Sequence, residues 1–128
     1  RCFLVDVGNP HAVIFVRECI PEDWVELGET ISTHATFHHS NGVNVSFVRI
    51  NADNDIELCV YERGVGPTLA CGSGACAAVV AGHQQGTLGA MVSVHQRGGE
   101  LTINYPDLSK GVEMIGPAQF VFSGECEV

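Results

Sequence analysis

The sequence predicts an α+β domain in which about eight mostly antiparallel strands curl into a barrel-like sheet around a central buried helix. Two observations support this fold class. Short runs rich in Val, Ile and Phe recur along the chain between Gly, Pro and Asn-Asp turns, which is typical of strands. One segment, ACAAVVAGHQQG at residues 75–86, is apolar on nearly every face, so it is expected to be surrounded by sheet.

The first half of the chain combines two strand pairs with a surface helix. Residues 2–7 and 12–16 read as strands joined by GNPH, which places Asn9 and His11 at a tight corner. Residues 21–34 carry a Pro near the start, acids in the first turn and an apolar stripe, which predicts an amphipathic helix packed on the outside. Two more alternating runs, joined by the turn NADND, are expected at 44–50 and 56–61.

The second half begins with a segment that discourages regular structure, RGVGPTLACGSG at 63–74, because it is rich in glycine and contains a proline. The buried helix follows it. Four further strands with Gly or Pro-Asp turns between them are predicted at 91–97, 100–105, 112–116 and 118–126.

Length and charge limit the functional classes. A chain of 128 residues fits a single domain and is long enough to bury a core of its own. Its net charge of −9 argues against a nucleic-acid partner. No apolar run approaches the roughly 18 residues of a membrane span, so no membrane association is expected.

The cysteines and the single lysine bear on compartment and cofactor. No secretory signal pattern accompanies the six cysteines, and several lie in apolar runs, so we expect a reducing, cytoplasmic compartment. Lys110 is the only lysine and lies in a turn-like segment, a poor position for a pyridoxal-phosphate Schiff base. We expect no cofactor and no metal, since the cysteines and histidines lack paired ligand spacing.

The segment ERGVGPTLACGSGACAA at 62–78 carries the strongest chemical signal. Cys71 falls in its glycine-rich loop, where unpaired N–H groups and the positive end of the helix dipole meet. A thiol there is easier to ionise, and the N–H groups of Gly72, Ser73 and Gly74 could hold a carboxylate. This combination suits a base that removes the proton from a carbon next to a carboxylate.

A structural interpretation stands beside the chemical one. Glycines also serve simply to turn a chain, and Cys71 could be a small core residue. Cys76 lies inside the predicted helix among Ala and Val, so core filling is its expected role.

Four motifs then make the chain recognisable: GNPH, NVSFV, YERG and ACGSGACAA occur in the order and spacing of diaminopimelate epimerases. The resemblance spans nearly the whole chain, and the last motif is the specific one. Two departures are Pro67, where the family commonly has Glu, and FHHSNG at 37–42, where a proline-containing segment is usual. His38 and His39 are expected to be exposed.

The resemblance implies an enzyme of two similar halves with the active site in the cleft between them and one catalytic cysteine from each. Residues 1–128 would be the carboxy-terminal domain, and the amino-terminal half would be the missing partner. The implied reaction is epimerisation of LL-diaminopimelate to meso-diaminopimelate, a small-molecule substrate, without a cofactor. The chain alone is expected to be inactive, and a homodimer is left open.

The resemblance also implies roles for individual residues. Cys71 would be one acid/base, with Gly72 and Ser73 holding the reacting carboxylate. Glu62 would adjust the proton affinity of Cys71, and His11 would do so for the absent cysteine. The distal end of the substrate would be held by Asn9, Asn44, Glu62 and Arg63.

Other interpretations of these residues and of the chain remain. Asn9 could be a turn residue, His11 a satisfied corner histidine, Asn44 a strand-start cap, and Glu62 with Arg63 an exposed charge pair. The chain could also be a related racemase or isomerase, of the proline racemase or phenazine-biosynthesis type, or a non-catalytic binding domain. A cysteine hydrolase is less favoured, because no histidine adjoins the loop in sequence.

Overall fold

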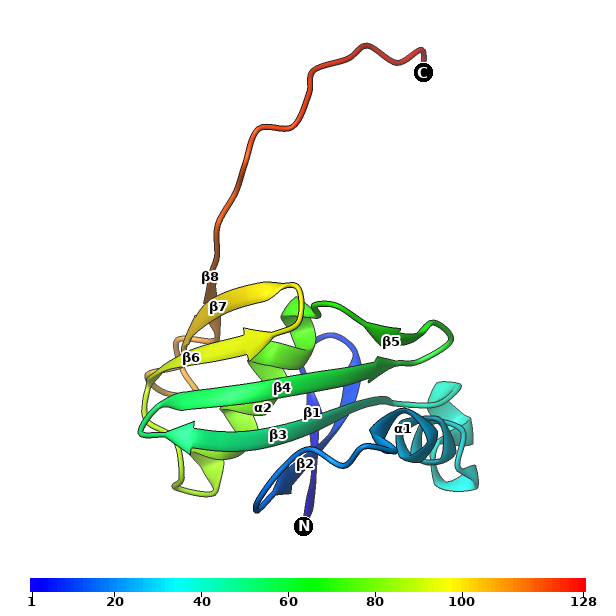
Figure 1. The fold of residues 1–128 in the computed structure, drawn as a ribbon, viewed down its shortest axis with the longest axis vertical. Coiled ribbons are helices and arrows are strands. Elements are labelled where there is room, and N and C mark those ends of the chain that lie inside the picture. The colour runs from blue at the N-terminus through cyan, green and yellow to red at the C-terminus, as the bar shows by residue number, and fades with distance from the viewer.

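The computed structural model describes all 128 residues, and one curled sheet dominates it (Figure 1). Its eight strands run in the order β1-β2-β3-β4-β6-β7-β8, with the short β5 pairing to β4 beside this path. The strands are β1 (Cys2–Asp6), β2 (Pro10–Val16), β3 (Asn44–Ala52), β4 (Asp55–Glu62), β5 (Gly66–Thr68), β6 (Met91–Gln96), β7 (Gly99–Asn104) and β8 (Glu113–Ile115). The helices are α1 (Trp24–Ser32), the 3₁₀ helix η1 (Ala35–Ser40) and α2 (Gly72–Gln84).

Most neighbouring strands are antiparallel, as predicted, but two pairs are parallel. These are β2 with β3 and β4 with β6. Parallel neighbours need a long crossover connection, and here the two α-helices provide it. The chain passes through α1 between β2 and β3 and through α2 between β4 and β6. The α+β prediction is therefore confirmed, with a mixed sheet.

Helix α2 lies in the concave face of the sheet, which confirms the predicted central helix (Figure 1). Its neighbours lie so close that larger side chains would not fit in place of its alanines and glycines. A Cβ on Gly82 would lie 2.2 Å from Leu88 Cδ1, and one on Gly74 would lie 2.8 Å from Val60 Cγ2. The sheet supplies the bulk of this core, including Ile56, whose full burial contributes roughly 1.5 to 3 kcal/mol.

A second, smaller core lies on the convex face of the sheet, under α1. Trp24 packs edge-on against Phe47 with ring centroids 6.3 Å apart, and Val45 is buried beside them. Gly28 lets α1 approach the sheet, because a Cβ there would lie 2.6 Å from Tyr61 Cβ. Strand β3 is thus covered on both faces, which explains why its first five residues are all buried.

Several predicted elements differ from the observed ones. The first helix begins at Trp24 and not at residue 21, and Leu27 on its expected apolar stripe is exposed. His38 and His39 are exposed as predicted, although they lie in η1. Strand β5 was not predicted, because a Gly-Pro pair rarely marks a strand. It exists because it pairs with the end of β4.

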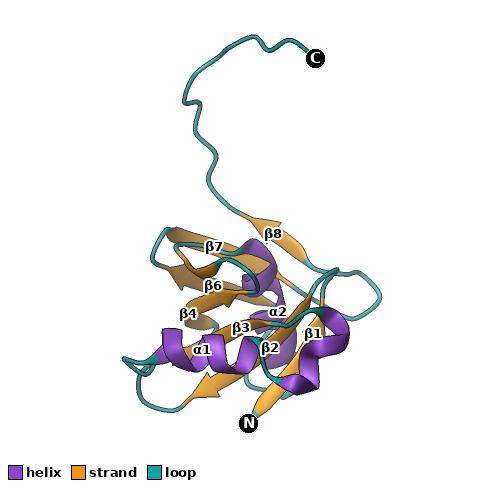
Figure 2. Cartoon of the chain, turned by 90° about the vertical axis from the view of Figure 1, so that its right-hand side faces the viewer, coloured by secondary structure: helices purple, strands orange, loops and turns teal.

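The predicted strand at 118–126 is wrong. Residues 116–128 have no regular secondary structure and extend away from the domain (Figure 2). Phe120 and Phe122 are more than four-fifths exposed. The segment contains the aromatic and β-branched residues typical of a strand, but no other strand of the chain pairs with it. Neither α-helix has the length and apolar composition that crossing a bilayer requires.

Candidate active site

Cys71 is the N-cap residue of α2, which confirms its predicted position at the start of the helix. Its backbone is extended (φ −141°, ψ 109°), and its carbonyl accepts the first helical hydrogen bond, from Ala75 N–H at 3.0 Å. The Gly74 N–H donates to Cys71 Sγ at 3.4 Å. The sulfur therefore lies against the amino-terminal end of the helix.

The first four N–H groups of a helix have no backbone partner within it. In α2, two of these groups find a side-chain acceptor and two do not. The Cys71 N–H donates to Gln96 Oε1 at 2.8 Å, and the Gly74 N–H donates to Cys71 Sγ. The N–H groups of Gly72 and Ser73 donate to no group of the protein. Two backbone donors beside the sulfur thus remain for an anion.

Gly72 has no room for a side chain. A Cβ at this position would lie 2.8 Å from Met114 Sδ, because β8 packs its methionine onto the first turn of α2. The glycine therefore serves both the packing of β8 and the close approach of a ligand to the backbone.

The Ser73 hydroxyl is the polar centre of the site. Its Oγ lies 3.5 Å from Cys71 Sγ and 3.1 Å from His11 Nε2, and it accepts a hydrogen bond from Asn9 Nδ2 at 3.3 Å. Residues from the start of β2 and from the first turn of α2 are joined through this one oxygen. The structure thus brings Asn9, His11, Cys71 and Ser73 together.

His11 is fully buried, and its Nδ1 has no hydrogen-bond partner. Burial lowers the pKa of His11 from 6.5 to about 4, and the carboxylates of Glu62 and Asp6 only partly oppose this shift. The imidazole is therefore neutral at pH 7. It belongs to β2 and not to the corner itself, which Asp6 closes by accepting the Gly8 N–H at 2.8 Å.

Strand register brings a second group of predicted residues to the same end of the sheet. His11 is paired with Asn44 across β2 and β3, and β4 ends beside them at Glu62. Asn44 Nδ2 donates to Pro10 O at 3.0 Å, and its Oδ1 accepts the Arg63 N–H at 2.9 Å. One donor and one lone pair of this buried amide remain for a ligand.

Glu62 and Arg63 each have one side-chain hydrogen bond within the protein. Glu62 Oε1 accepts from Thr68 Oγ1 at 2.7 Å, and Arg63 Nη1 donates to the Ser40 carbonyl. No hydrogen bond joins Glu62 to Cys71 within this chain. Arg63 lines a surface hollow of about 420 Å³ between α1, η1 and the end of β4.

Sequence reasoning missed two residues that support this site, Thr68 and Gln96. Thr68 lies in the unpredicted strand β5 and carried no signal. Gln96 could have been recognised from the sequence. Alternate residues of β6 face the core, so Gln96 lies on the same face as the buried Val92 and Val94. A polar side chain on a core-facing position indicates a buried hydrogen-bond partner.

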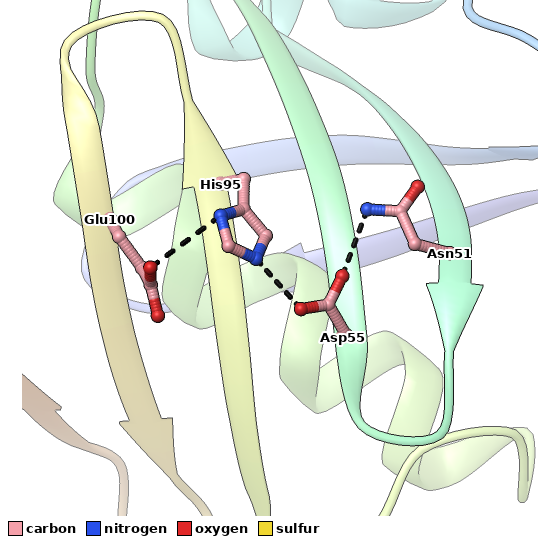
Figure 3. A network of polar contacts seen from close by, with 4 residues as sticks. All are labelled: Asn51, Asp55, His95 and Glu100. Atoms are coloured by element: carbon pink, nitrogen blue, oxygen red, sulfur yellow. Dashed lines mark hydrogen bonds and ion pairs between the residues drawn. The ribbon is translucent and has the colours of Figure 1, made fainter.

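A separate polar cluster lies on the strands away from this site (Figure 3). His95 Nε2 lies 2.7 Å from Asp55 Oδ2 and its Nδ1 lies 3.6 Å from Glu100 Oε2, while Asn51 Nδ2 donates to Asp55 Oδ1 at 2.9 Å. The hydrogen bond to Asp55 raises the pKa of His95. The cluster links β3, β4, β6 and β7 and shares no hydrogen bond with Ser73 or Cys71.

No group of three or more His, Cys, Asp or Glu side chains is arranged to hold a metal ion.

Comparison with known sequences assigns the whole folded part of the chain to one family. The family model described as diaminopimelate epimerase matches residues 3–121. The diaminopimelate epimerase of Natranaerobius thermophilus is 47% identical over 122 residues, covering 94% of this chain and 40% of the relative. That of Pelotomaculum thermopropionicum is 46% identical over 125 residues, covering 98% of this chain and 44% of the relative. The chain thus spans less than half the length of these relatives.

Comparison with solved structures confirms the fold. A phenazine biosynthesis protein of the PhzF family from Bacillus anthracis superimposes with a TM-score of 0.62 at 21% identity, over 85% of this chain and 35% of that chain. A protein of the same family from Enterococcus faecalis superimposes with a TM-score of 0.58 at 16% identity, over 83% of this chain and 38% of that chain. At these identities the likeness concerns the architecture alone.

Proposed function

This chain belongs to the diaminopimelate epimerase family, and from that premise we propose that it is the Cys71-bearing, carboxy-terminal half of a two-domain epimerase. The proposed reaction converts LL-diaminopimelate to meso-diaminopimelate without a cofactor. The relatives are more than twice as long as the region they share with this chain, which leaves room for a second half. The isolated chain should then be inactive, because the opposing cysteine lies in that other half.

One observation carries the proposal: a sulfur and two unpaired N–H groups lie together at the start of α2. In the proposed step, the Cys71 thiolate removes the α-proton of the substrate and becomes a thiol. The electron pair left on the α-carbon delocalises into the α-carboxylate, whose oxygens accept hydrogen bonds from Gly72 and Ser73. The thiol of the opposing cysteine then protonates the other face of the carbon and becomes a thiolate.

The remaining residues of the site are proposed to position the substrate and its partner groups. Neutral His11 would face the cysteine of the other half without adding a positive charge. Asn9, Asn44, Glu62 and Arg63 would bind the distal end of the substrate, which is itself an amino acid and needs groups of both signs. To bind the distal carboxylate, Arg63 would either give up its hydrogen bond to the Ser40 carbonyl or donate from the N–H groups that this bond leaves free.

The absence of a cofactor is proposed on the chemistry of the side chains. Lys110, the sole lysine, is exposed and lies 3.7 Å from Asp107, far from the buried environment of a Schiff-base lysine. Cys71 is a free thiol, as the proposed mechanism requires.

The test of Cys71 uses the full-length protein that contains this chain. We expect Cys71→Ala to lower the rate of LL-to-meso conversion by on the order of 10² to 10⁴. Cys76→Ala is the matched control, five positions further along the same helix. Burial raises the pKa of the Cys76 thiol, and proximity to Cys71 raises it further, so it is not suited to act as a base. A Cys71→Ala protein that still epimerises at near wild-type rate would show the mechanism to be wrong.

The distal contacts are tested by the substrate. Arg63→Lys keeps the charge but loses the planar guanidinium, so KM for diaminopimelate should rise with less effect on kcat. Proline has no distal amino-acid group, and wild-type turnover of proline at a comparable rate would favour a related racemase instead.

A further inference from the structure

Gln96 at the end of β6 contacts the candidate catalytic loop through a hydrogen bond that spans 25 positions of sequence. Its side-chain Oε1 accepts the Cys71 N–H at 2.8 Å. We infer that Gln96 is a positioning residue for Cys71, completing the N-cap of α2 so that the sulfur and the two free N–H groups keep their places. This role rests on the proposed function, since the geometry it maintains is that of the proposed base and carboxylate cradle.

The need for Gln96 follows from the sequence of the helix start. In a common N-cap arrangement, the side chain three positions after the cap reaches back to the N–H of the cap residue. That position is Gly74 in α2, and it cannot carry a side chain. A Cβ there would lie 2.8 Å from Val60 Cγ2 and 3.3 Å from Cys71 Sγ. The Cys71 N–H therefore needs an acceptor from elsewhere in the fold, and β6 provides it.

A second hydrogen bond joins the loop before α2 to the hairpin formed by β6 and β7. The Gly98 N–H, in the turn between β6 and β7, donates to the Leu69 carbonyl at 2.7 Å. Gln96 and Gly98 thus hold the loop on both sides of Ala70, just before the helix begins. The Gln96 Nε2 atom is buried and has no partner, so the Cys71 contact is the only hydrogen bond this side chain makes.

The division of donors at the helix start depends on this contact. With the Cys71 N–H bound to Gln96, the extended backbone of Cys71 turns Sγ toward the Gly74 N–H. Only the N–H groups of Gly72 and Ser73 then remain for a ligand. Without Gln96, the Cys71 N–H would be a third, competing donor, and the peptide that carries the sulfur would lose its anchor.

The experiment compares three variants of the full-length protein. Gln96→Met keeps the size of the side chain and removes the acceptor. Gln96→Glu keeps the acceptor and adds a negative charge next to Cys71. Gln84→Met is the control, an exposed glutamine at the far end of the same helix. The measurements are hydrogen exchange of the Cys71 amide and the pH dependence of kcat and KM.

For Gln96→Met we expect faster exchange of the Cys71 amide and a kcat lower by about tenfold at every pH, with KM changed by less than about twofold. Gln96→Glu should keep the slow exchange. Its carboxylate opposes ionisation of the thiol, so its activity should fall at neutral pH and return as the pH is raised. Gln84→Met should match the wild type in all respects.

A folded Gln96→Met protein with wild-type exchange and kcat would overturn the inference. If Gln96→Met does not fold, Gln96→Glu decides: a pH profile that superimposes on the wild type overturns the inference, and a shifted one supports it. The exchange data do not depend on turnover. A wild-type protein that protects the Cys71 amide through Gln96 but does not epimerise would refute the proposed function and leave the contact standing.

Discussion

The hydroxyl of Ser73 lies 3.1 Å from His11 Nε2, although 62 positions separate the two residues in the sequence. This contact joins the first turn of the central helix to the second strand of the sheet. His11 is fully buried and Ser73 is partly buried. This hydrogen bond therefore contributes both to the geometry of the site and to the stability of the domain.

Ser73→Ala should lower the free energy of unfolding by about 1 to 3 kcal/mol, because it leaves His11 Nε2 buried without a partner. Urea denaturation measures the change. Ser46→Ala is the matched control: Ser46 is fully buried, but its hydroxyl has no hydrogen-bond partner, so its loss should be neutral or stabilising. Equal losses in the two variants would show that the Ser73–His11 contact contributes nothing.

His11 should make the domain sensitive to acid. Its pKa is lowered from 6.5 to about 4 in the folded state, so between these values the unfolded chain binds a proton that the folded chain does not. Stability is thus complete above pH 6.5 and falls as the pH drops toward 4, by about 3 kcal/mol in all. His11→Gln should flatten this slope in urea titrations at pH 4.5, 5.5 and 7. An unchanged slope would contradict the buried, neutral state of His11.

His95 should act in the opposite direction. Its hydrogen bond to Asp55 raises the pKa of His95, so the contribution of His95 is complete below pH 6.5 and is lost as the pH rises through its folded pKa. The hydrogen bonds from Asn51 and then from His95 lower the pKa of Asp55, whose own contribution is lost only in acid. Both side chains are about one third or more exposed, so the effect should stay below about 1 kcal/mol. His95→Gln should therefore be less stable than the wild type at pH 6 and closer to it at pH 9.

Gly82→Ala should destabilise the domain although alanine is the better helix former. The added methyl carbon would lie 2.2 Å from Leu88 Cδ1, and such overpacking costs about 1 to 3 kcal/mol. Leu88→Ala alone opens a cavity, but the double variant should be more stable than the sum of the two losses predicts. Additive losses in this double-mutant cycle would show that the two residues do not compete for space.

Deleting residues 117–128 should change the free energy of unfolding by less than about 0.5 kcal/mol, because the segment is exposed and pairs with no strand of this domain. Ile103→Ala, in the buried part of β7, is the contrasting variant and should cost about 2 to 5 kcal/mol. Thermal unfolding of the three proteins makes the comparison. A large loss on deletion would mean that the segment packs against this domain.

The parts of the fold that depend on local sequence could be predicted. The alanine-rich run that forms α2, the alternating strands and the position of Cys71 at the helix start all follow from patterns within a dozen residues. The residues named for the site also come together, because the register of β2 against β3 sets His11 beside Asn44.

What could not be predicted depends on pairing between distant segments. The segment at 118–126 has the aromatic and β-branched residues of a strand, but a strand forms only where a neighbouring strand pairs with it. Strand β5 is the reverse case, since its Gly-Pro sequence argues against a strand and the end of β4 nevertheless pairs with it. Gln96 reaches Cys71 from another hairpin, and only the fold brings those two hairpins together.

The small side chains of α2 have a consequence for how this architecture can diversify. Ala75, Ala77 and Ala78 are wholly enclosed, and a Cβ added at Gly74 or Gly82 would lie 2.8 or 2.2 Å from a neighbouring side chain. Natural selection cannot enlarge this helix to reshape a binding cavity without rebuilding the surrounding strands. New binding preferences should instead arise at the strand ends and connecting loops, which tolerate substitution better than a packed helix does.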